Sequence, residues 1–120
     1  MKLDGGISSN LTAAASSAQA LEDAGYSGGW TAETAHDPFF PLLLAAEHTS
    51  KLEIGTSIAV AFARNPMTLA NIGWDLQSYS QGRFILGLGS QIKPHITKRF
   101  SMEWSHPAPR MREMIQAIRA

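Results

Sequence analysis

The sequence has 120 residues and a formal net charge of zero, with 44% hydrophobic and 17% charged residues. This composition is typical of a globular protein, and we expect a single domain over residues 1–120. Ten basic residues balance ten acidic ones without a basic run, which argues against a nucleic-acid partner; the lack of cysteine excludes disulfides and thiolate metal sites. Because no apolar run is long enough for a membrane span or a signal peptide, we expect a cytoplasmic protein with no membrane partner.

The first part of the chain is predicted to form a short strand and then a helix. Residues 2–7 lean apolar and weakly indicate the strand. Ser8, Ser9 and Asn10 can accept hydrogen bonds from the free N–H groups at a helix start, and apolar residues then recur at helical spacing. Gly25 fits the left-handed backbone position that ends such a helix.

A second strand and helix follow at once. Residues 26–31 are predicted to form a short, glycine-rich strand. Asp37-Pro38 marks a loop, after which the second helix is expected from Pro41 to Thr49 because proline is well suited to the first helical turn.

The third strand is the clearest in the sequence. Residues 52–60 are apolar on both faces apart from Thr56 and Ser57, as expected for a parallel strand that is covered on both sides. Asn65-Pro66 predicts the start of a third helix, which Gly82 ends. The apolar stripe expected on this helix consists of Leu69, Ile72, Leu76 and Tyr79.

The fourth strand is expected at residues 83–89, where Phe84, Ile85 and Leu86 are continuously apolar. A polar loop follows, and Pro107 and Pro109 lead into a fourth helix that continues to the end of the sequence. Its apolar stripe consists of Met111, Met114, Ile115 and Ile118.

Strands that alternate with helices predict an α/β fold made of parallel β-α units with right-handed crossovers. The pattern alone leaves two architectures open, namely an open four-stranded sheet and a part of an (α/β)8 barrel. In both, ligands bind beyond the carboxyl ends of the strands. Those ends are followed by the loops at residues 30–37, 60–65 and 89–106.

The segment from Trp30 to Pro38 is the first candidate site. His36 could exchange a proton with a substrate, and Glu33 could accept hydrogen bonds from a ligand. The alternative interpretation is structural: Asp37 caps the second helix, His36 is a solvated loop residue and Trp30 packs in the core.

Two further segments have small residues where a flat ligand could approach the backbone, at Gly55–Val60 and at Gly87–Gln91. Ordinary strand packing and a strand that ends in a turn are the alternatives. Neither segment has the glycine spacing of a dinucleotide-binding or phosphate-binding loop. A basic group could meet an anionic cofactor tail or simply be a solvated loop; it consists of Lys93, His95, Lys98 and Arg99.

At these residues the sequence resembles the luciferase-like monooxygenase superfamily, and most closely its coenzyme F420-dependent oxidoreductases. The resemblance covers nearly the whole chain. One block, similar to the family pattern D-x-L-S-x-G-R-x-x-L-G-x-G, spans residues 76–89. The other blocks are residues 29–39, 54–66 and 99–113.

The resemblance implies an (α/β)8 barrel of which this chain holds about four of the eight units, and a homodimer formed through the second and third helices. It also implies a non-prolyl cis peptide bond at Ser57-Ile58 that bulges under a cofactor ring, and a small-molecule substrate. The residues expected to line the cofactor pocket are Trp30, Glu33, Ser57, Ile58, Gly89 and Ser90, with His36 or Glu33 as the candidates for catalytic proton transfer. Two positions depart from the family: Thr34 stands where many relatives have histidine, and Ser90 stands where glutamate is frequent.

Three functions follow as hypotheses. The first is an oxidoreductase that uses coenzyme F420, and the second is an FMN-dependent monooxygenase of the same superfamily. The third is a non-catalytic, degenerate half-barrel that serves binding or assembly. A complete barrel typically needs about 250 residues. We therefore expect a fragment, a truncated gene product or a half-barrel that completes itself by pairing.

Overall fold

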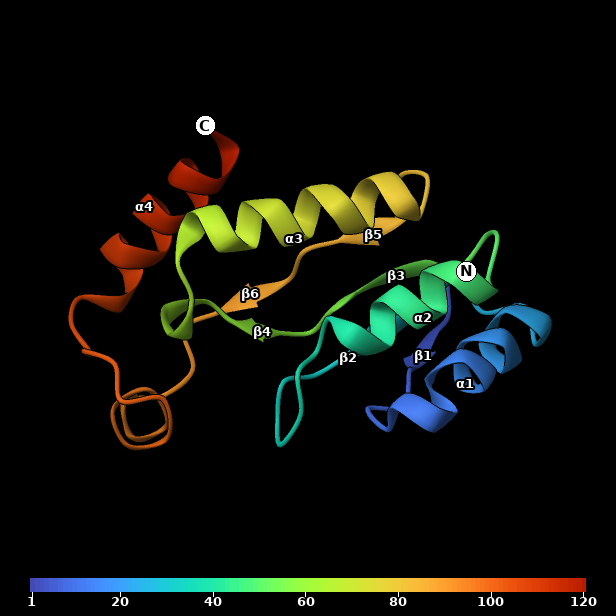
Figure 1. Ribbon diagram of the computed structural model, residues 1–120, viewed down its shortest axis with the longest axis horizontal. Coiled ribbons are helices and arrows are strands. Elements are labelled where there is room, and N and C mark those ends of the chain that lie inside the picture. The colour runs from blue at the N-terminus through green and yellow to red at the C-terminus, as the bar shows by residue number, and fades with distance from the viewer.

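The computed structural model describes all 120 residues and has the predicted α/β architecture (Figure 1). The strands are β1 (Asp4–Gly6), β2 (Gly28–Thr31), β3 (Glu53–Thr56), β4 (Ala59–Val60), β5 (Phe84–Ile85) and β6 (Leu88–Gly89). The α-helices are α1 (Leu11–Asp23), α2 (Phe40–His48), α3 (Pro66–Tyr79) and α4 (Pro107–Arg119). A 3-10 turn at Ala61–Ala63 and a π-helical turn at His95–Arg99 complete the chain.

The main sheet has the order β1-β2-β3-β5, and every neighbouring pair is parallel. The short strands β4 and β6 follow β3 and β5 along the chain and pair with each other, again in parallel. The predicted third and fourth strands are therefore each divided in two. The predicted order of β-α units is confirmed, with strands that follow one another in the chain lying side by side.

The ends of α1 and α3 form where the sequence predicts them, whereas α2, predicted from Pro41 to Thr49, spans Phe40–His48. The side chains of Asn10 and Asn65 accept hydrogen bonds from the backbone N–H groups of Thr12 and Met67, at 3.0 and 2.8 Å. Gly25 and Gly82 follow α1 and α3 with φ angles of 85° and 87°, in the left-handed region that glycine adopts without a steric penalty.

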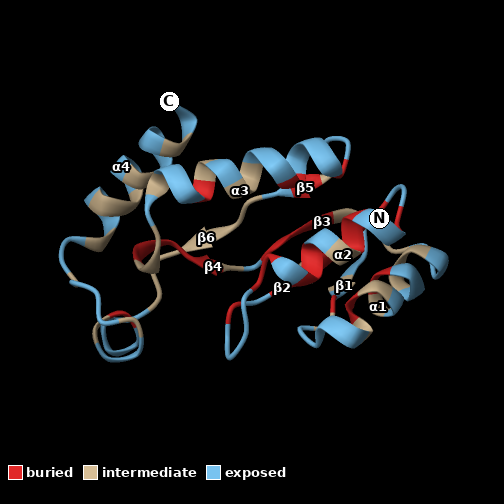
Figure 2. Cartoon of the chain, viewed as in Figure 1, coloured by how far each residue is buried: buried red, intermediate tan, exposed pale blue.

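Helices α1, α2 and α3 pack on one face of the sheet and form the main core. Its fully buried side chains include Ala14 and Ala18 of α1, Leu42 and Ala45 of α2, Leu69 of α3, and Ile54 of β3 (Figure 2). Helix α4 has no buried residue; Met114 and Ile118 pack against this core from its edge. None of the helices combines the length and the apolar content needed to cross a bilayer.

Two local expectations were wrong. Tyr79 belongs to the predicted apolar stripe of α3 but is exposed, because it lies in the last turn of the helix, where its hydroxyl is 3.4 Å from Glu47 of α2. The polar loop after β6 contains the π-helical turn at His95–Arg99. This turn forms because Ile96 is fully buried in a second cluster with Val60 and Phe62.

The opposite face of the sheet is lined by glycine. Gly6, Trp30, Gly55 and Ile85 lie in register across the four strands. The indole of Trp30 lies so close to Gly55 that a Cβ atom there would come within 2.5 Å of the ring, and a Cβ atom on Gly6 would meet nothing. With Ile85 41% exposed, this face is open.

Candidate functional site

The carboxyl ends of the parallel strands β2, β3 and β5 lie at the same end of the sheet. Thr31 pairs with Thr56 at the ends of β2 and β3, and Val60 pairs with Gly89 at the ends of β4 and β6. The carboxyl ends of these strands therefore lie side by side, and we call this end of the sheet the rim. In parallel sheets this edge is where ligands bind, since the loops that follow the strands surround it.

The peptide bond Ser57-Ile58 lies between β3 and β4 and is cis, as the resemblance implies. Its two ends are tied to the end of β2: the Ser57 N–H donates to the carbonyl oxygen of Thr31 at 2.6 Å, and the carbonyl oxygen of Ile58 accepts from the N–H of Glu33 at 3.2 Å. The Ser57 side chain is exposed and that of Ile58 is half-buried. We call Ser57-Ile58 the ledge.

Glycines of the neighbouring strand let the ledge lie where it does. A Cβ atom on Gly89 would come within 2.5 Å of Cδ1 of Ile58. A Cβ atom on Gly87 would overlap the carbonyl oxygen of Thr56. The small residues predicted at these positions thus serve the contact between two strands, and Ser90, which follows Gly89, is half-buried.

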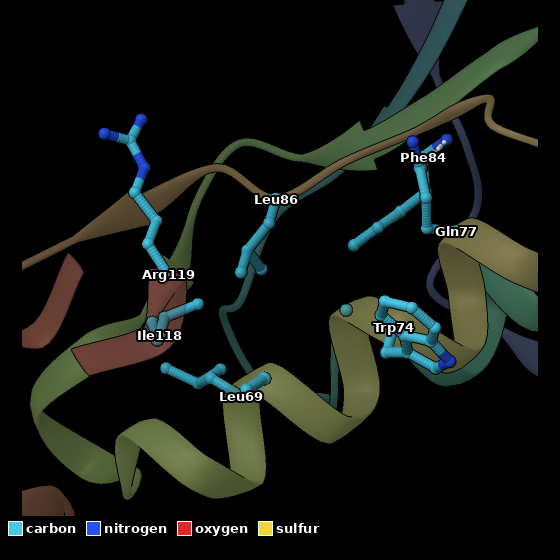
Figure 3. A pocket seen from close by; sticks show the side chains of 9 residues that line it. Leu69, Trp74, Gln77, Phe84, Leu86, Ile118 and Arg119 are labelled. Carbon is cyan, nitrogen blue, oxygen red and sulfur yellow. Dashed lines mark hydrogen bonds between the residues drawn. The ribbon is translucent and has the colours of Figure 1, made fainter. Parts of the chain in front are cut away.

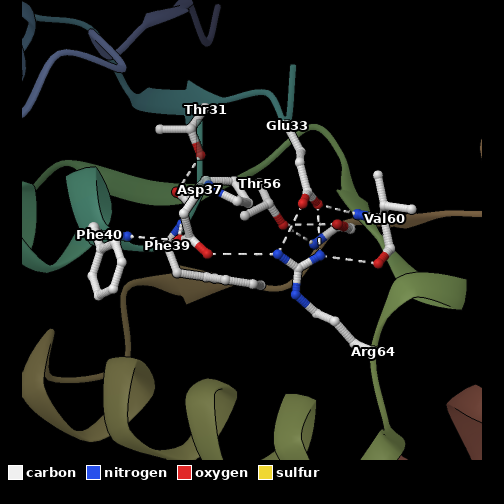
Figure 4. Close-up of polar contacts among 10 residues, drawn as sticks. Thr31, Glu33, Asp37, Phe39, Phe40, Thr56, Val60 and Arg64 are labelled. Carbon is white, nitrogen blue, oxygen red and sulfur yellow. Dashed lines mark hydrogen bonds and ion pairs between the residues drawn. The ribbon is translucent and has the colours of Figure 1, made fainter. Parts of the chain in front are cut away.

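Glu33 is buried beside the ledge, and both of its carboxylate oxygens are engaged (Figure 4). Oε1 accepts from the backbone N–H of Val60 at 2.7 Å and from Nη1 of Arg64 at 2.6 Å, and Oε2 accepts from Nη2 of Arg64 at 2.9 Å. This network joins the loop after β2 to β4 and to the start of α3. It gives the Glu33 carboxylate a structural role at the rim.

Arg64 is the residue of this site that reasoning from the sequence missed. It precedes Asn65-Pro66 in one of the family-like blocks, and nothing in its spacing pairs it with Glu33, 31 residues earlier. A long-range ion pair of this kind has no sequence signal, because it depends on which strands lie side by side.

His36 and Asp37 lie in the loop between β2 and α2 and have different environments. His36 is exposed, and its ring makes no hydrogen bond within the chain. Asp37 accepts hydrogen bonds through Oδ1 from the backbone N–H groups of Phe39 and Phe40, at 2.7 and 3.2 Å, at the start of α2. Asp37 therefore binds the start of α2 as the structural interpretation expects, although the N-cap residue is Phe39 and not Asp37. The catalytic role of His36 stays a prediction.

Trp30 directly precedes Thr31, the last residue of β2, and lies on the open glycine-lined face of the sheet. Its indole Nε1 donates to Oδ2 of Asp4 in β1 at 3.1 Å, and its ring packs over Gly55 and Gly28. The side chain is half-buried, so it belongs neither to the core between sheet and helices nor to the exposed loop. Its predicted place in a cofactor pocket stays a prediction.

The basic group is exposed on the loop after β6. Lys93 and His95 begin this segment, and Lys98 and Arg99 end the π-helical turn. No ion pair joins any of the four to an acidic residue. Their exposure fits the solvated interpretation, and the predicted contact with an anionic cofactor tail stays a prediction.

A hollow of about 650 Å³ lies on the helix side of the sheet, between α3, β5 and the end of α4 (Figure 3). Its walls are mainly apolar, with Leu69, Phe84, Leu86 and Ile118 among them. The side chain of Gln77 is occupied, since its Oε1 accepts from the N–H of Phe84 at 3.0 Å. This hollow is away from the rim and brings no reactive group together.

Comparison with known proteins places these features in a family. The family model described as luciferase-like monooxygenase matches residues 2–120. The uncharacterized protein Rv1360 of Mycobacterium tuberculosis (strain H37Rv) is 70% identical over 120 residues, which are 100% of this chain and 35% of that protein. The chain thus spans about a third of the length of the curated relatives it matches.

Two solved structures share the fold. The coenzyme F420-dependent tetrahydromethanopterin reductase from Methanopyrus kandleri superposes with a TM-score of 0.81 at 25% identity, over 98% of this chain and 40% of the other. The oxygenating constituent of 3,6-diketocamphane monooxygenase from Pseudomonas putida, in complex with FMN, superposes with a TM-score of 0.85 at 17% identity, over 98% and 39%. The parallel sheet is therefore part of the barrel that these luciferase-like enzymes have. With its parallel strands and a family match over nearly every residue, this chain belongs to the luciferase-like monooxygenase family.

Proposed function

We propose that this chain forms the ring-binding rim of a coenzyme F420-dependent oxidoreductase that acts on a small organic substrate. The observation that carries the proposal is the convergence of three parallel strands, where Ser57 and Ile58 lie between β3 and β4 and Ile58 lies against Gly89. The resemblance of the sequence to F420-dependent oxidoreductases supports the choice of cofactor. Because the chain spans about a third of its relatives' length, the activity proposed is that of a whole barrel.

The residues at the rim fit a flat ring. Ile58 and Gly89 are in contact and together give an apolar surface, while the exposed hydroxyl of Ser57 can donate a hydrogen bond to a polar edge of the ring. Ser90 follows Gly89 in the chain, and its hydroxyl donates to the carbonyl oxygen of Gln91 at 3.2 Å, which leaves its oxygen able to accept. When bound, the deazaflavin would supply a hydride at carbon 5.

His36 is the group that we propose for proton transfer. It is exposed on the loop beside the rim, and an imidazole can exchange a proton near neutral pH. Glu33 suits this task less, because Val60 and Arg64 already use both of its oxygens. We propose that Glu33 instead positions the backbone of Ile58 and Val60, to which it is hydrogen-bonded.

Titration with F420 and with FMN, followed by the absorbance of each chromophore, tests the proposal directly. We expect F420 to bind more tightly than FMN, and we expect Gly89→Val to weaken binding at least about tenfold because the added side chain would displace Ile58. Gly6→Ala is the matched control, since a Cβ atom at Gly6 meets open space. Equal loss of binding in both variants would contradict the placement of the ring.

The same titration distinguishes the other functions. Preferential binding of FMN, with oxygen uptake after reduction, would favour the FMN-dependent monooxygenase, which shares this part of the fold. A degenerate, non-catalytic half-barrel predicts that neither cofactor binds, even after the remainder of a relative's barrel is supplied. The F420 proposal is contradicted by either result.

We also propose that two copies associate through α2 and α3. The outer faces of these helices expose Phe40, Leu43, Trp74 and Tyr79, and Trp74 is 78% exposed. A hollow of about 610 Å³ between the two helices is lined by Leu43, Trp74 and Tyr79. Large apolar side chains that are exposed together on one surface typically mark an interface between proteins.

Pairing of half-barrels through the open sheet face is the competing mode, and one pair of variants separates the two. Trp74→Lys is expected to convert the dimer to a monomer because the charge would be buried in the interface between helices. Ile85→Lys, on the open sheet face, is expected to leave the dimer intact. Sedimentation velocity measures both, and the reverse result would establish pairing through the sheet.

A further inference from the structure

The side chain of Arg64 reaches both ends of the loop that carries His36. This loop runs from Glu33 to Asp37, and Arg64 comes from a distant segment between the 3-10 turn and α3. At the first end of the loop, Nη1 and Nη2 of Arg64 donate to the two oxygens of Glu33. At the other end, Nη2 is 3.6 Å from Oδ2 of Asp37 (Figure 4).

The guanidinium of Arg64 is largely shielded from solvent. The side chains of Arg64 and Glu33 are 15% and 6% exposed. Nη1 also donates to the carbonyl oxygen of Val60 at 3.0 Å, and the guanidinium carbon is 5.2 Å from the centre of the Phe39 ring. A planar fork with five donors can satisfy partners in several directions at once, whereas the single ammonium group of a lysine cannot.

The contacts of Arg64 affect the ledge as well as the 33–37 loop. Glu33 donates its backbone N–H to the carbonyl oxygen of Ile58, and its carboxylate accepts from the N–H of Val60. These two bonds hold the backbone from Ile58 to Val60, directly after Ser57, against Glu33. The position of Glu33, which Arg64 holds by two charged hydrogen bonds, therefore fixes the ledge on one side and the three exposed residues Thr34, Ala35 and His36 on the other.

We propose that Arg64 is a positioning residue, a clamp that holds both ends of the 33–37 loop. By holding them, it fixes the position of the ledge and the position of His36 relative to the ledge. The inference rests on the proposed function, because the ledge and His36 are the parts of the site that it assigns to ring binding and proton transfer. It adds a residue and a role: Arg64 acts through Glu33, Asp37 and Val60 without touching the ring.

Arg64→Lys is the decisive variant. The lysine keeps the positive charge beside Glu33 but reaches only one partner, so we expect the melting temperature to fall, as it should in the control variant Arg83→Lys. The hydrogen exchange of the Glu33 and Val60 amides should become roughly tenfold faster, because their loop and strand are no longer held from both sides. Affinity for whichever of F420 or FMN binds should fall roughly tenfold, with a change in the absorbance spectrum of the bound ring.

Two further variants complete the experiment. Arg83→Lys is the matched control: Arg83 also makes hydrogen bonds in several directions, to Thr49, Leu52 and Ala46, but it does so at the opposite ends of the strands. It should lower the melting temperature and leave ring affinity and the spectrum unchanged. Asp37→Asn keeps a side-chain oxygen that can accept from the N–H groups of Phe39 and Phe40 but removes the charge that faces Arg64, and it should raise exchange at Glu33 less than Arg64→Lys does.

The outcomes separate the clamp from the proposed function. Unchanged exchange and affinity in Arg64→Lys would overturn the clamp even if the ring binds as proposed. Faster exchange in Arg64→Lys, in a chain that binds neither cofactor, would support the clamp and overturn the proposed function. Equal effects of Arg64→Lys and Arg83→Lys on affinity would overturn the clamp, because they would show a general loss of stability.

Discussion

Gly87→Ala is expected to lower the free energy of unfolding by about 3 kcal/mol, because the new methyl group would overlap the backbone of Thr56. Gly87 lies between β5 and β6, where its N–H donates to Oγ1 of Thr56 at 2.9 Å and its carbonyl oxygen accepts from that hydroxyl at 2.7 Å. The same carbonyl oxygen accepts from the N–H of Ala59 at 2.9 Å. Alanine would push the two strands apart exactly where the ledge begins, so ring affinity should fall together with stability.

Urea unfolding measures this effect, and Gly73→Ala is its matched control. Gly73 lies inside α3, where a Cβ atom would only make ordinary contact with Leu86, at 3.8 Å. Alanine favours the helix there and should raise the free energy of unfolding by about 0.5–1 kcal/mol. A Gly87→Ala chain as stable as the original would show that β3 and β5 have more freedom than this packing allows.

Glu22→Ala is expected to lower the free energy of unfolding by about 1 kcal/mol at neutral pH, because solvent can replace part of what is lost. The Glu22 carboxylate, in the last turn of α1, accepts hydrogen bonds from the backbone N–H groups of Ser50, Lys51 and Leu52, at 2.7 to 3.2 Å. These groups precede β3, so one side chain attaches the first helix to the start of the third strand. Its removal leaves three N–H donors with no partner in the chain.

The contribution of Glu22 should depend on pH. Burial raises the pKa of this carboxyl, but the hydrogen bonds from Lys51, Leu52 and Ser50 and the charge of Arg83 outweigh burial and leave the pKa below its ordinary value of 4.5. A carboxyl with a lowered pKa in the folded state stabilises the fold above its unfolded pKa. That contribution is lost as the pH falls through the folded pKa.

Urea unfolding at a series of pH values from neutral to strongly acidic tests this dependence. The difference in stability between the original chain and Glu22→Gln should be constant well above pH 4.5 and should shrink as the pH falls through the lowered pKa of Glu22. Asp23→Ala is the control, because Asp23 is the exposed neighbour of Glu22 on the same helix and makes no hydrogen bond through its side chain. A difference that stays constant to strongly acidic pH would show that the charge of Glu22 contributes nothing.

Much of the architecture is determined locally. Asn10 and Asn65 cap their helices, and Gly25 and Gly82 end them, because each needs only its own backbone neighbours to act. The alternation of apolar strands with amphipathic helices is also visible in the sequence, and it implies a parallel sheet whose strand ends meet at one edge. The ledge at Ser57-Ile58 followed from the resemblance to a family rather than from any local pattern.

The tertiary structure decided the partners of side chains that are far apart in the chain. Glu33 meets Arg64 and Val60 across 31 and 27 residues, and Glu22 meets the start of β3 across 28 to 30. Ile96 is buried although its segment is polar and reads as a loop. No period or spacing encodes such meetings, because they exist only once parallel pairing has placed β2 beside β3 and brought their loops to a common edge.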